Sequence, residues 1–475
     1  MKLKSRALIA VLLITFVIIP RFAFPADDRP SRFISPVTRT WEIAPDPEAR
    51  DGLEPGLALR LRHVAAENII TLGAGPDPGR DFSRVKLQVW AQAWFTPGLG
   101  GHLRFNTERK YWHDCESCAD TGEEIIVENL YLEVLNLAHL PIAMRLGRQN
   151  LFYGDGFIIC DGSPLDGSRT SYVNAGLFTF TLPGLALDLF LISDHEQDDY
   201  LPRLNDENTR LAETDECLMG VYFKTMPYAG EESRYHLEPY FVIKRENTEQ
   251  GLNRISTLGG RLVYPTRRTE TRIELAYQTG NLDYIGSEGG TEEDYQEARN
   301  VSAFGGTFYF DVNLERLYSL SFGGGYVYLS GDDPKTLAKY EGWNPVLGRW
   351  PQWSELYIYT LIPEGGVAYW QNIHFPMIRA GIEPYKRLRL YATYLWMYAD
   401  KEPAYDPRGQ QFESLKRGEL FTFRFSYKLE KYLFGHILYE HFSPGGFYNY
   451  LWREEGISGE PQGASFLRFE LSFAI

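Results

Sequence analysis

The stretch Phe466-Leu-Arg-Phe-Glu-Leu-Ser-Phe-Ala-Ile475 ends the sequence and decides its fold. Apolar residues occupy every odd position from Leu467 to Ile475, and polar or small residues lie between them. A period of two is typical of a β-strand with one apolar and one polar face. The same alternation recurs at 388–398 and 421–429. Runs of about ten residues are long enough to cross a bilayer with tilt, so the pattern predicts membrane-spanning strands.

The composition excludes several other classes of protein. The chain has 475 residues, is 44% hydrophobic and 15% aromatic, and carries a formal net charge of −15. So many apolar and aromatic residues can bury a core, which excludes disorder. No run of about 18 apolar residues follows residue 20, which excludes an α-helical membrane protein. The acidic balance argues against a nucleic-acid partner, because phosphates require a basic face.

Eighteen alternating segments, from 57–65 to 466–475, cover most of the sequence. Short and long connectors follow one another in strict turn, as in barrels with short periplasmic turns and long extracellular loops. We therefore predict an all-β, antiparallel, up-and-down transmembrane barrel of 18 strands in the outer membrane of a Gram-negative bacterium, surrounded by lipid and lipopolysaccharide. A soluble β-sandwich or repeat array is less consistent with the sequence, because no repeat of 20–50 residues is visible. The connectors predicted to be long are 66–82, 111–123, 150–170, 193–216, 245–254, 280–299, 330–369, 400–417 and 443–465.

The N-terminus indicates export. Lys2, Lys4 and Arg6 precede the apolar stretch 7–20, and a cleavage point follows Ala26. This arrangement is typical of a secretory signal peptide. We predict a signal peptide at 1–26, a Pro-rich periplasmic extension at 27–56 that offers a docking segment for a periplasmic partner, and the barrel at 57–475.

The charges divide between loops and strands. The long loops are mostly acidic, whereas the strands and short turns carry more Lys and Arg than Asp and Glu. Charged side chains are costly on the lipid face, so strand charges should point into the lumen. A basic lumen favours anions, but lumenal Arg can also merely pair with lumenal Asp or Glu, and the sequence leaves both interpretations open. The pore-lining candidates found by strand parity are Arg60, Arg62, Arg84, Lys86, Arg104, Arg145, Arg261, Arg272, Arg389, Arg424 and Arg468.

No catalytic or metal motif stands out. The sequence has no GxSxG, HExxH or phosphate-binding GKS/T motif, so we expect neither an enzyme nor a cofactor. The four cysteines, Cys115, Cys118, Cys160 and Cys217, all lie on the side of the barrel predicted to be extracellular. An oxidising compartment favours disulfides over a metal site, with Cys115–Cys118 and Cys160–Cys217 as the first pairing to consider and the other two connectivities open.

Two stretches resemble the alginate-export family of outer-membrane porins. The first runs through Arg145-Leu-Gly-Arg-Gln-Asn150, Tyr153-Gly-Asp-Gly156 and Asp166-Gly-Ser-Arg169, and the second is Tyr340–Tyr357. The resemblance implies a monomeric 18-stranded barrel whose electropositive constriction passes an anionic polysaccharide. Position by position, it implies that Arg145, Arg148, Asp155 and Arg169 belong to that constriction.

The loop 150–170 is rich in turn residues, so it can fold back compactly. Folded inward, it would narrow a lumen that 18 strands otherwise leave wide; the alternative is a surface loop held by Cys160. We expect a porin or export channel that passively conducts an anionic solute, either an alginate-like polysaccharide or a small anion. The alternative is a structural or assembly barrel that houses a periplasmic or surface partner.

Overall fold

The wall of the protein is a single antiparallel sheet that closes on itself. The computed structural model describes residues 52–69, 72, 81–113, 125–160, 172–201, 204, 214–225, 235–248, 251–283, 298–314, 319–348, 353–356, 371–385, 387–402, 412, 414–430, 432–449 and 460–475. None of the described helices is long and apolar enough to cross a membrane.

Eighteen long strands make the wall, and each predicted alternating segment forms one of them. Their bounds are β1 Gly52–Glu67, β2 Phe82–Thr96, β3 Leu99–Trp112, β4 Ile125–Val134, β5 Ile142–Gln149, β6 Val173–Leu182, β7 Leu185–Asp194, β8 Asp215–Thr225, β9 His236–Thr248, β10 Gly251–Pro265, β11 Thr269–Leu282, β12 Arg299–Leu314, β13 Leu320–Leu329, β15 Ile373–Tyr385, β16 Leu388–Tyr398, β17 Lys416–Glu430, β18 Leu433–Pro444 and β19 Ala464–Ala474. A short 3₁₀ turn, η1 (Leu137–His139), lies between β4 and β5. The two-residue β14 (Lys339–Tyr340) lies in the connection after β13 and pairs in parallel with β12.

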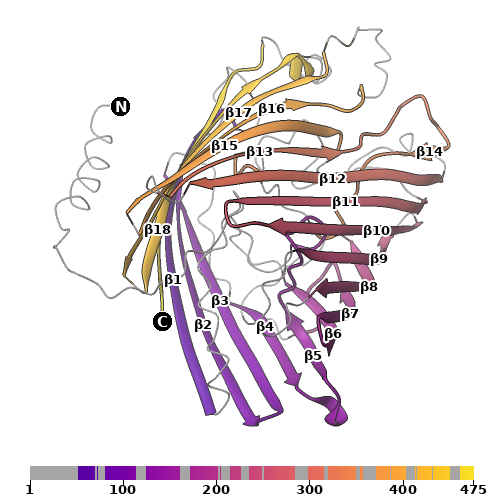
Figure 1. Ribbon diagram of the computed structural model, residues 1–475, viewed down its shortest axis with the longest axis vertical. Helices are drawn as coiled ribbons and strands as arrows, with labels where there is room; N and C mark the ends of the chain where they lie inside the picture. Colours follow the sequence, from indigo (N-terminus) through magenta and orange to yellow (C-terminus); the bar gives the residue numbers. More distant parts are fainter. Residues whose placement is uncertain are drawn as a thin grey trace. The chain divides into compact units, whose positions relative to one another are not determined.

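Each long strand pairs antiparallel with its neighbours in chain order, as the ribbon in Figure 1 shows. The last strand, β19, pairs with β1 from Ala58↔Ala474 to Glu67↔Ser465. The sheet therefore has no free edge, and every strand can satisfy its backbone hydrogen bonds inside a bilayer. The predicted 18-stranded transmembrane barrel is confirmed.

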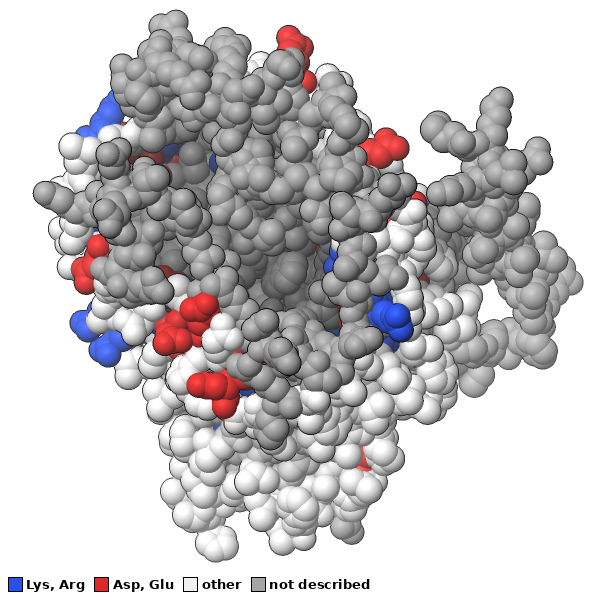
Figure 2. Space-filling view, turned by 180° about the vertical axis from the view of Figure 1, so that it is seen from behind, with Lys and Arg blue, Asp and Glu red and all other residues white. Residues whose placement is uncertain are grey.

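The two faces of the wall differ as the alternation requires. Large apolar side chains such as Leu61, Leu258 and Phe308 are exposed on the outside. Arg62, Glu274 and Arg468, which lie on the other face of their strands, are buried. In the lower part of Figure 2 the wall is nearly all uncharged. An apolar outer belt around a polar interior is the pattern of outer-membrane barrels.

Two differences from the predicted boundaries are larger than the others. The first strand starts at Gly52, ahead of the expected residue 57. The predicted long connector 245–254 is wrong, because β9 and β10 stay paired as far as Thr248↔Gly251. Residues there are mostly polar (Arg245-Glu-Asn247, Asn253-Arg254). Their backbones continue the hydrogen-bond ladder after the apolar alternation has ended.

Candidate functional site

Two loop segments fold into the barrel and meet there. The first, Leu151–Cys160, buries Tyr153, Ile158 and Ile159, and the Tyr153 hydroxyl donates to Asp188 of β7 at 3.0 Å. The second, Trp343–Leu356, belongs to the connection between β13 and β15 and is described at 343–348 and 353–356. They are joined by two backbone hydrogen bonds: Cys160 N to Leu347 O (3.1 Å) and Leu347 N to Ile158 O (2.9 Å). Residues 151–160 therefore fold inward, as expected for the loop after β5, whereas 161–171 lie outside the described residues.

Asp155 fastens the first segment to the wall. Its carboxylate accepts hydrogen bonds from Arg261 of β10 and Arg272 of β11, each at 3.1 Å. Burial by itself raises the pKa of the Asp155 carboxyl, but Arg272 and Arg261 outweigh that effect and hold the pKa below its ordinary value. Asp155 is therefore ionised at neutral pH and links two strands to the loop.

The two described parts of the second segment contact opposite sides of the barrel. The side chain of Gln278 on β11 exchanges two hydrogen bonds with the backbone of Asn344, at 2.7 and 2.9 Å. The ammonium of Lys244 on β9 donates to the carbonyl of Val346 at 3.1 Å. At the far end, Glu440 of β18 accepts from Ser354 Oγ (2.8 Å) and from the backbone N–H groups of residues 355 (3.0 Å) and 356 (2.6 Å).

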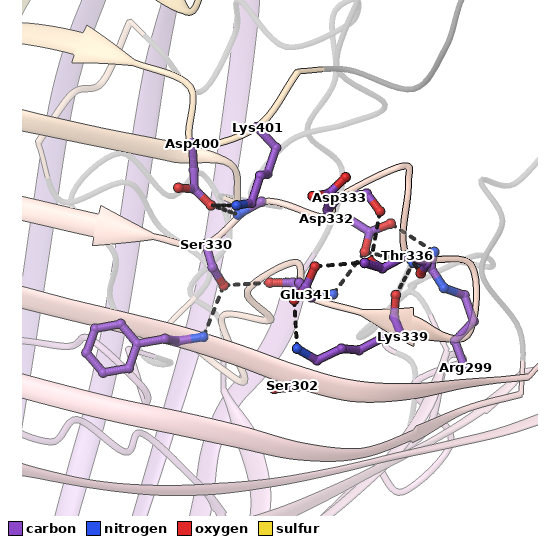
Figure 3. A network of polar contacts seen from close by, with 12 residues as sticks. Arg299, Ser302, Ser330, Asp332, Asp333, Thr336, Lys339, Glu341, Asp400 and Lys401 are labelled. Atoms are coloured by element: carbon purple, nitrogen blue, oxygen red, sulfur yellow. Dashed lines mark hydrogen bonds and ion pairs between the residues drawn. The ribbon is translucent and has the colours of Figure 1, made fainter.

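A polar network holds the start of this second connection, as Figure 3 shows. Arg299 of β12 makes a two-pronged contact with Asp332, at 2.8 and 2.9 Å. Ser330 Oγ donates to the carbonyl of Glu341 at 2.6 Å, and Gly331 N donates to Asp400 at 3.0 Å. The connection thus leaves the wall in a fixed direction before it turns into the lumen.

The charges on the inner face are not evenly distributed. We call the inner face of β17, β18, β19 and β1–β4 the seam wall, and the inner face of β7–β12 the facing wall. Two strands on one side and three on the other separate them in the closed sheet. Among the described residues, the seam wall carries Arg60, Arg62, Arg84, Lys86, Arg104, Lys110, Arg424, Lys428 and Arg468 against Glu54, Glu108, Glu128, Glu133, Glu440 and Glu470. The facing wall carries Lys224, Lys244, Arg261, Arg272 and Arg299 against Asp188, Asp194, Glu216, Glu238, Glu246, Glu270, Glu274 and Asp311. The seam wall is therefore basic and the facing wall acidic.

Most of the predicted lining residues point inward but are paired. The ion pairs are Arg60–Glu108 (3.2 Å), Arg62–Glu470 (2.6 Å), Arg84–Glu108 (3.5 Å), Lys86–Glu128 (3.8 Å), Arg104–Glu128 (2.7 Å), Arg145–Glu133 (3.0 Å), Arg261–Glu238 (3.0 Å), Arg272–Glu270 (3.3 Å), Arg389–Glu383 and Arg468–Glu355 (3.1 Å). Among the predicted lining residues that the structure describes, Arg424 contacts no carboxylate, and its Nε donates to Ser426 Oγ at 3.1 Å. Arg424 is partly buried and lies on the inner face of β17, opposite Leu438 of β18.

The structure does not place Arg148 on the lumenal face. Its register partner on β4 is Leu130, one of the apolar side chains exposed on the outer wall. The guanidinium is buried and binds Asp198 in the connection after β7, with Nη1 to Oδ2 at 2.9 Å. It also lies over the ring of Tyr172, 4.4 Å from the centroid. Arg148 therefore holds two loops together, and Arg169 lies outside the described residues.

The proposed bond between Cys160 and Cys217 is not formed. Cys160 is buried in the inward segment, whereas Cys217 is exposed and follows the inward-facing Glu216 on β8. The wall of the barrel separates the two thiols, because successive strand residues point to opposite faces. Cys115 and Cys118 lie outside the described residues.

Sequence reasoning missed the residues that seat the loops. Asp198, Gln278, Ser354 and Glu440 are ordinary polar residues in their local sequence. The one available indication was the density of Trp, Pro and Gly in 340–357, which is unusual for a solvated loop. Trp343 is indeed buried, against Gly305 of β12.

Comparison with known proteins supports the fold. No protein-family model matches the sequence, and no curated protein is similar to it in sequence. Solved structures do match, among them OccAB1 of Acinetobacter baumannii (TM-score 0.54, 8% identity, 89% of this chain and 96% of that chain). Others are OccK7 (OpdD) of Pseudomonas aeruginosa (0.51, 14%, 89% and 98%) and a BenF-like porin of Pseudomonas fluorescens Pf-5 (0.51, 11%, 89% and 98%).

The architecture is thus that of Gram-negative outer-membrane porins, and it places the chain in the outer membrane. The comparisons give no support to the alginate-export family in particular.

Proposed function

We propose that the protein is a passive outer-membrane channel for small anionic solutes, with carboxylates such as uronates as the class it favours. The observation that carries the proposal is the basic seam wall, on which one carboxylate often pairs with two Lys or Arg side chains. Glu108 contacts both Arg60 (3.2 Å) and Arg84 (3.5 Å), and Glu128 contacts both Lys86 (3.8 Å) and Arg104 (2.7 Å). The positive charge left over attracts anions into the lumen.

The seam wall offers these charges along the length of the barrel. Arg84 lies near the long-loop end of β2, Arg424 lies in the middle of β17, and Lys428 lies near the short-turn end of the same strand. A guanidinium binds a carboxylate through two parallel N–H groups, which replace part of the water that the solute loses. A solute can therefore pass from one basic group to the next without covalent chemistry, and no catalytic step is part of the proposal.

The two inward segments favour small solutes over polymers. Both are fixed to the wall, the first through Asp155 and the second through Gln278, Lys244 and Glu440. A long polysaccharide such as alginate needs a path that stays open along many sugar units, so these fixed segments oppose its passage. We therefore place single uronates and short acidic saccharides ahead of alginate itself.

Swelling of liposomes that contain the refolded protein tests the proposal. We expect faster entry of galacturonate than of galactose, which has the same ring but no carboxylate, and no passage of alginate chains. Equal rates for the two monosaccharides would contradict charge selection. An absence of any permeation would favour the alternative function, a structural or assembly barrel that houses a partner.

A further inference from the structure

Three potential metal ligands gather on the outer face of the barrel, away from the lumen. His63 lies near the end of β1, Asp81 directly precedes β2, and His113 directly follows β3. One ligand atom from each lies within 4.8 Å of the others. All three belong to the long-loop end of adjacent strands, and His63 follows the exposed Leu61 on the outer face.

Hydrogen bonds already orient the two imidazoles. Ser83 Oγ lies 3.1 Å from Nδ1 of His63 and 2.8 Å from Nε2 of His113. The other nitrogen of His63, Nε2, faces Asp81 Oδ1 at 3.6 Å. A ligating histidine characteristically has its second ring nitrogen fixed by a hydrogen bond, which sets the ring's orientation. Ser83 supplies that bond for His63.

The ligand set determines which ions suit the site. Two imidazoles and one carboxylate suit zinc and neighbouring transition metals, whereas calcium and magnesium require mainly oxygen ligands. Ligand atoms of a tetrahedral zinc ion, with bonds of about 2.0–2.1 Å, lie about 3.3 Å apart. The observed spacing needs a closure of roughly an ångström or more, which the exposed His113 can make by a side-chain rotation.

The site is open to solution. The side chains of His63 and Asp81 are 36% and 32% exposed, and His113 is exposed. We propose that His63, Asp81 and His113 form a surface site for a divalent transition metal of the zinc class, which ties together the ends of β1, β2 and β3. Three protein ligands leave a fourth position for water or an external anion.

Zinc binding to the full refolded chain tests the proposal. Cys115 and Cys118 follow His113 closely in the sequence and are themselves candidate ligands. The experiment therefore uses Cys115→Ser/Cys118→Ser as its background. Titration of Zn²⁺ against a chromophoric chelator should give one ion per chain, and His113→Ala or Asp81→Asn should weaken binding by about tenfold or more.

The matched control is His139→Ala, which removes an exposed histidine from the turn after β4 and should leave binding unchanged. Heat-dependent gel mobility shows whether each variant is folded. If His113→Ala does not fold, His113→Gln replaces it in the experiment. Zinc affinity that is unchanged in His113→Ala, or zinc binding that vanishes in the Cys115→Ser/Cys118→Ser background, would overturn the proposal.

Discussion

The seam wall and the facing wall are both lined by basic and acidic side chains, but the balance of charge is opposite on the two. On the facing wall a single guanidinium, that of Arg272, lies near three carboxylates: Asp155 (3.1 Å), Glu270 (3.3 Å) and Asp311 (3.5 Å). On the seam wall a single carboxylate, that of Glu128, serves both Lys86 and Arg104. The first arrangement saturates positive charge and the second leaves a surplus.

The difference shows that arginines in a lumen have two separate roles. A buried charge must be paired, because an unpaired one loses its hydration without compensation. Arg261 and Arg272 therefore fasten Asp155 and its loop, and we propose that seam-wall residues keep part of their charge for the solute. A count of lumenal arginines in the sequence cannot separate these roles, but the number of carboxylates around each one can.

The facing wall should respond most strongly to Asp155→Asn. The change removes two charge-assisted hydrogen bonds that hold Leu151–Cys160 inside the lumen, so we expect a larger single-channel conductance. We also expect the free energy of unfolding in urea to fall by about 2 kcal/mol. The matched control is Asp199→Asn, an exposed carboxylate of the connection after β7. A conductance equal to that of the wild type would show that Asp155 does not hold the loop.

The seam wall should respond less to Glu440→Gln. The amide oxygen can still accept from Ser354 and the backbone N–H groups of residues 355 and 356, but without the carboxylate charge these bonds weaken. We expect a loss of about 1 kcal/mol in the free energy of unfolding. Glu419→Gln, in an exposed ion pair with Lys416, should cost less. Equal losses in the two variants would show that Glu440 does not seat the second segment.

Acid should release the first segment only at low pH. The pKa of Asp155 is held below its ordinary value of 3.8. Its contribution to stability is therefore complete at neutral pH and is lost as the pH falls through that lowered pKa. The change in conductance that depends on Asp155 should be absent from about pH 7 to 5 and should appear as a rise below about pH 4. Asp155→Asn should lack this rise. A rise of the same size in that variant would show that titratable groups other than Asp155 cause it.

Arg148 and Arg145 should differ although they lie close together on β5. Arg148→Met should leave anion selectivity unchanged, because Asp198 and Tyr172 enclose the guanidinium. Arg145→Met should lower selectivity, because that side chain is 31% exposed on the inner face. Reversal potentials of the two variants make the comparison. An equal loss of anion selectivity in both would show that Arg148 faces the lumen.

The fold could be predicted from the sequence because each strand has one face toward lipid and one toward a polar lumen. Apolar and polar residues therefore alternate along it. All eighteen long strands follow from it. The prediction failed at 245–254, where the strands continue beyond the apolar belt and only backbone pairing defines them. Alternation of apolar and polar residues reflects the surroundings of the side chains. The backbone hydrogen-bond ladder can continue beyond the last alternating residue.

The site could be predicted only in part. Strand parity assigned Arg60, Arg424 and Arg468 to the inner face, and the strand register places them there. Arg148 came instead from a family resemblance, although residues three apart on a strand, such as 145 and 148, point to opposite faces. The partners of the arginines depend on loops distant in sequence, as with Arg468 and Glu355, and no local pattern carries that information.

We propose that the seam wall, and Arg424 in particular, governs which ions pass. Reversal potentials across a potassium chloride gradient, for Arg424→Gln and Lys224→Gln, test it most directly, since each change removes one positive charge. A unit charge about 6 Å from a passing ion contributes about 0.7 kcal/mol in water, or about threefold in permeability. We predict that Arg424→Gln lowers the chloride-to-potassium permeability ratio by about threefold, while Lys224→Gln, on the already acidic facing wall, changes it less. A larger fall in Lys224→Gln, or a wild-type channel that prefers potassium, would show that the seam wall does not set the ion selectivity.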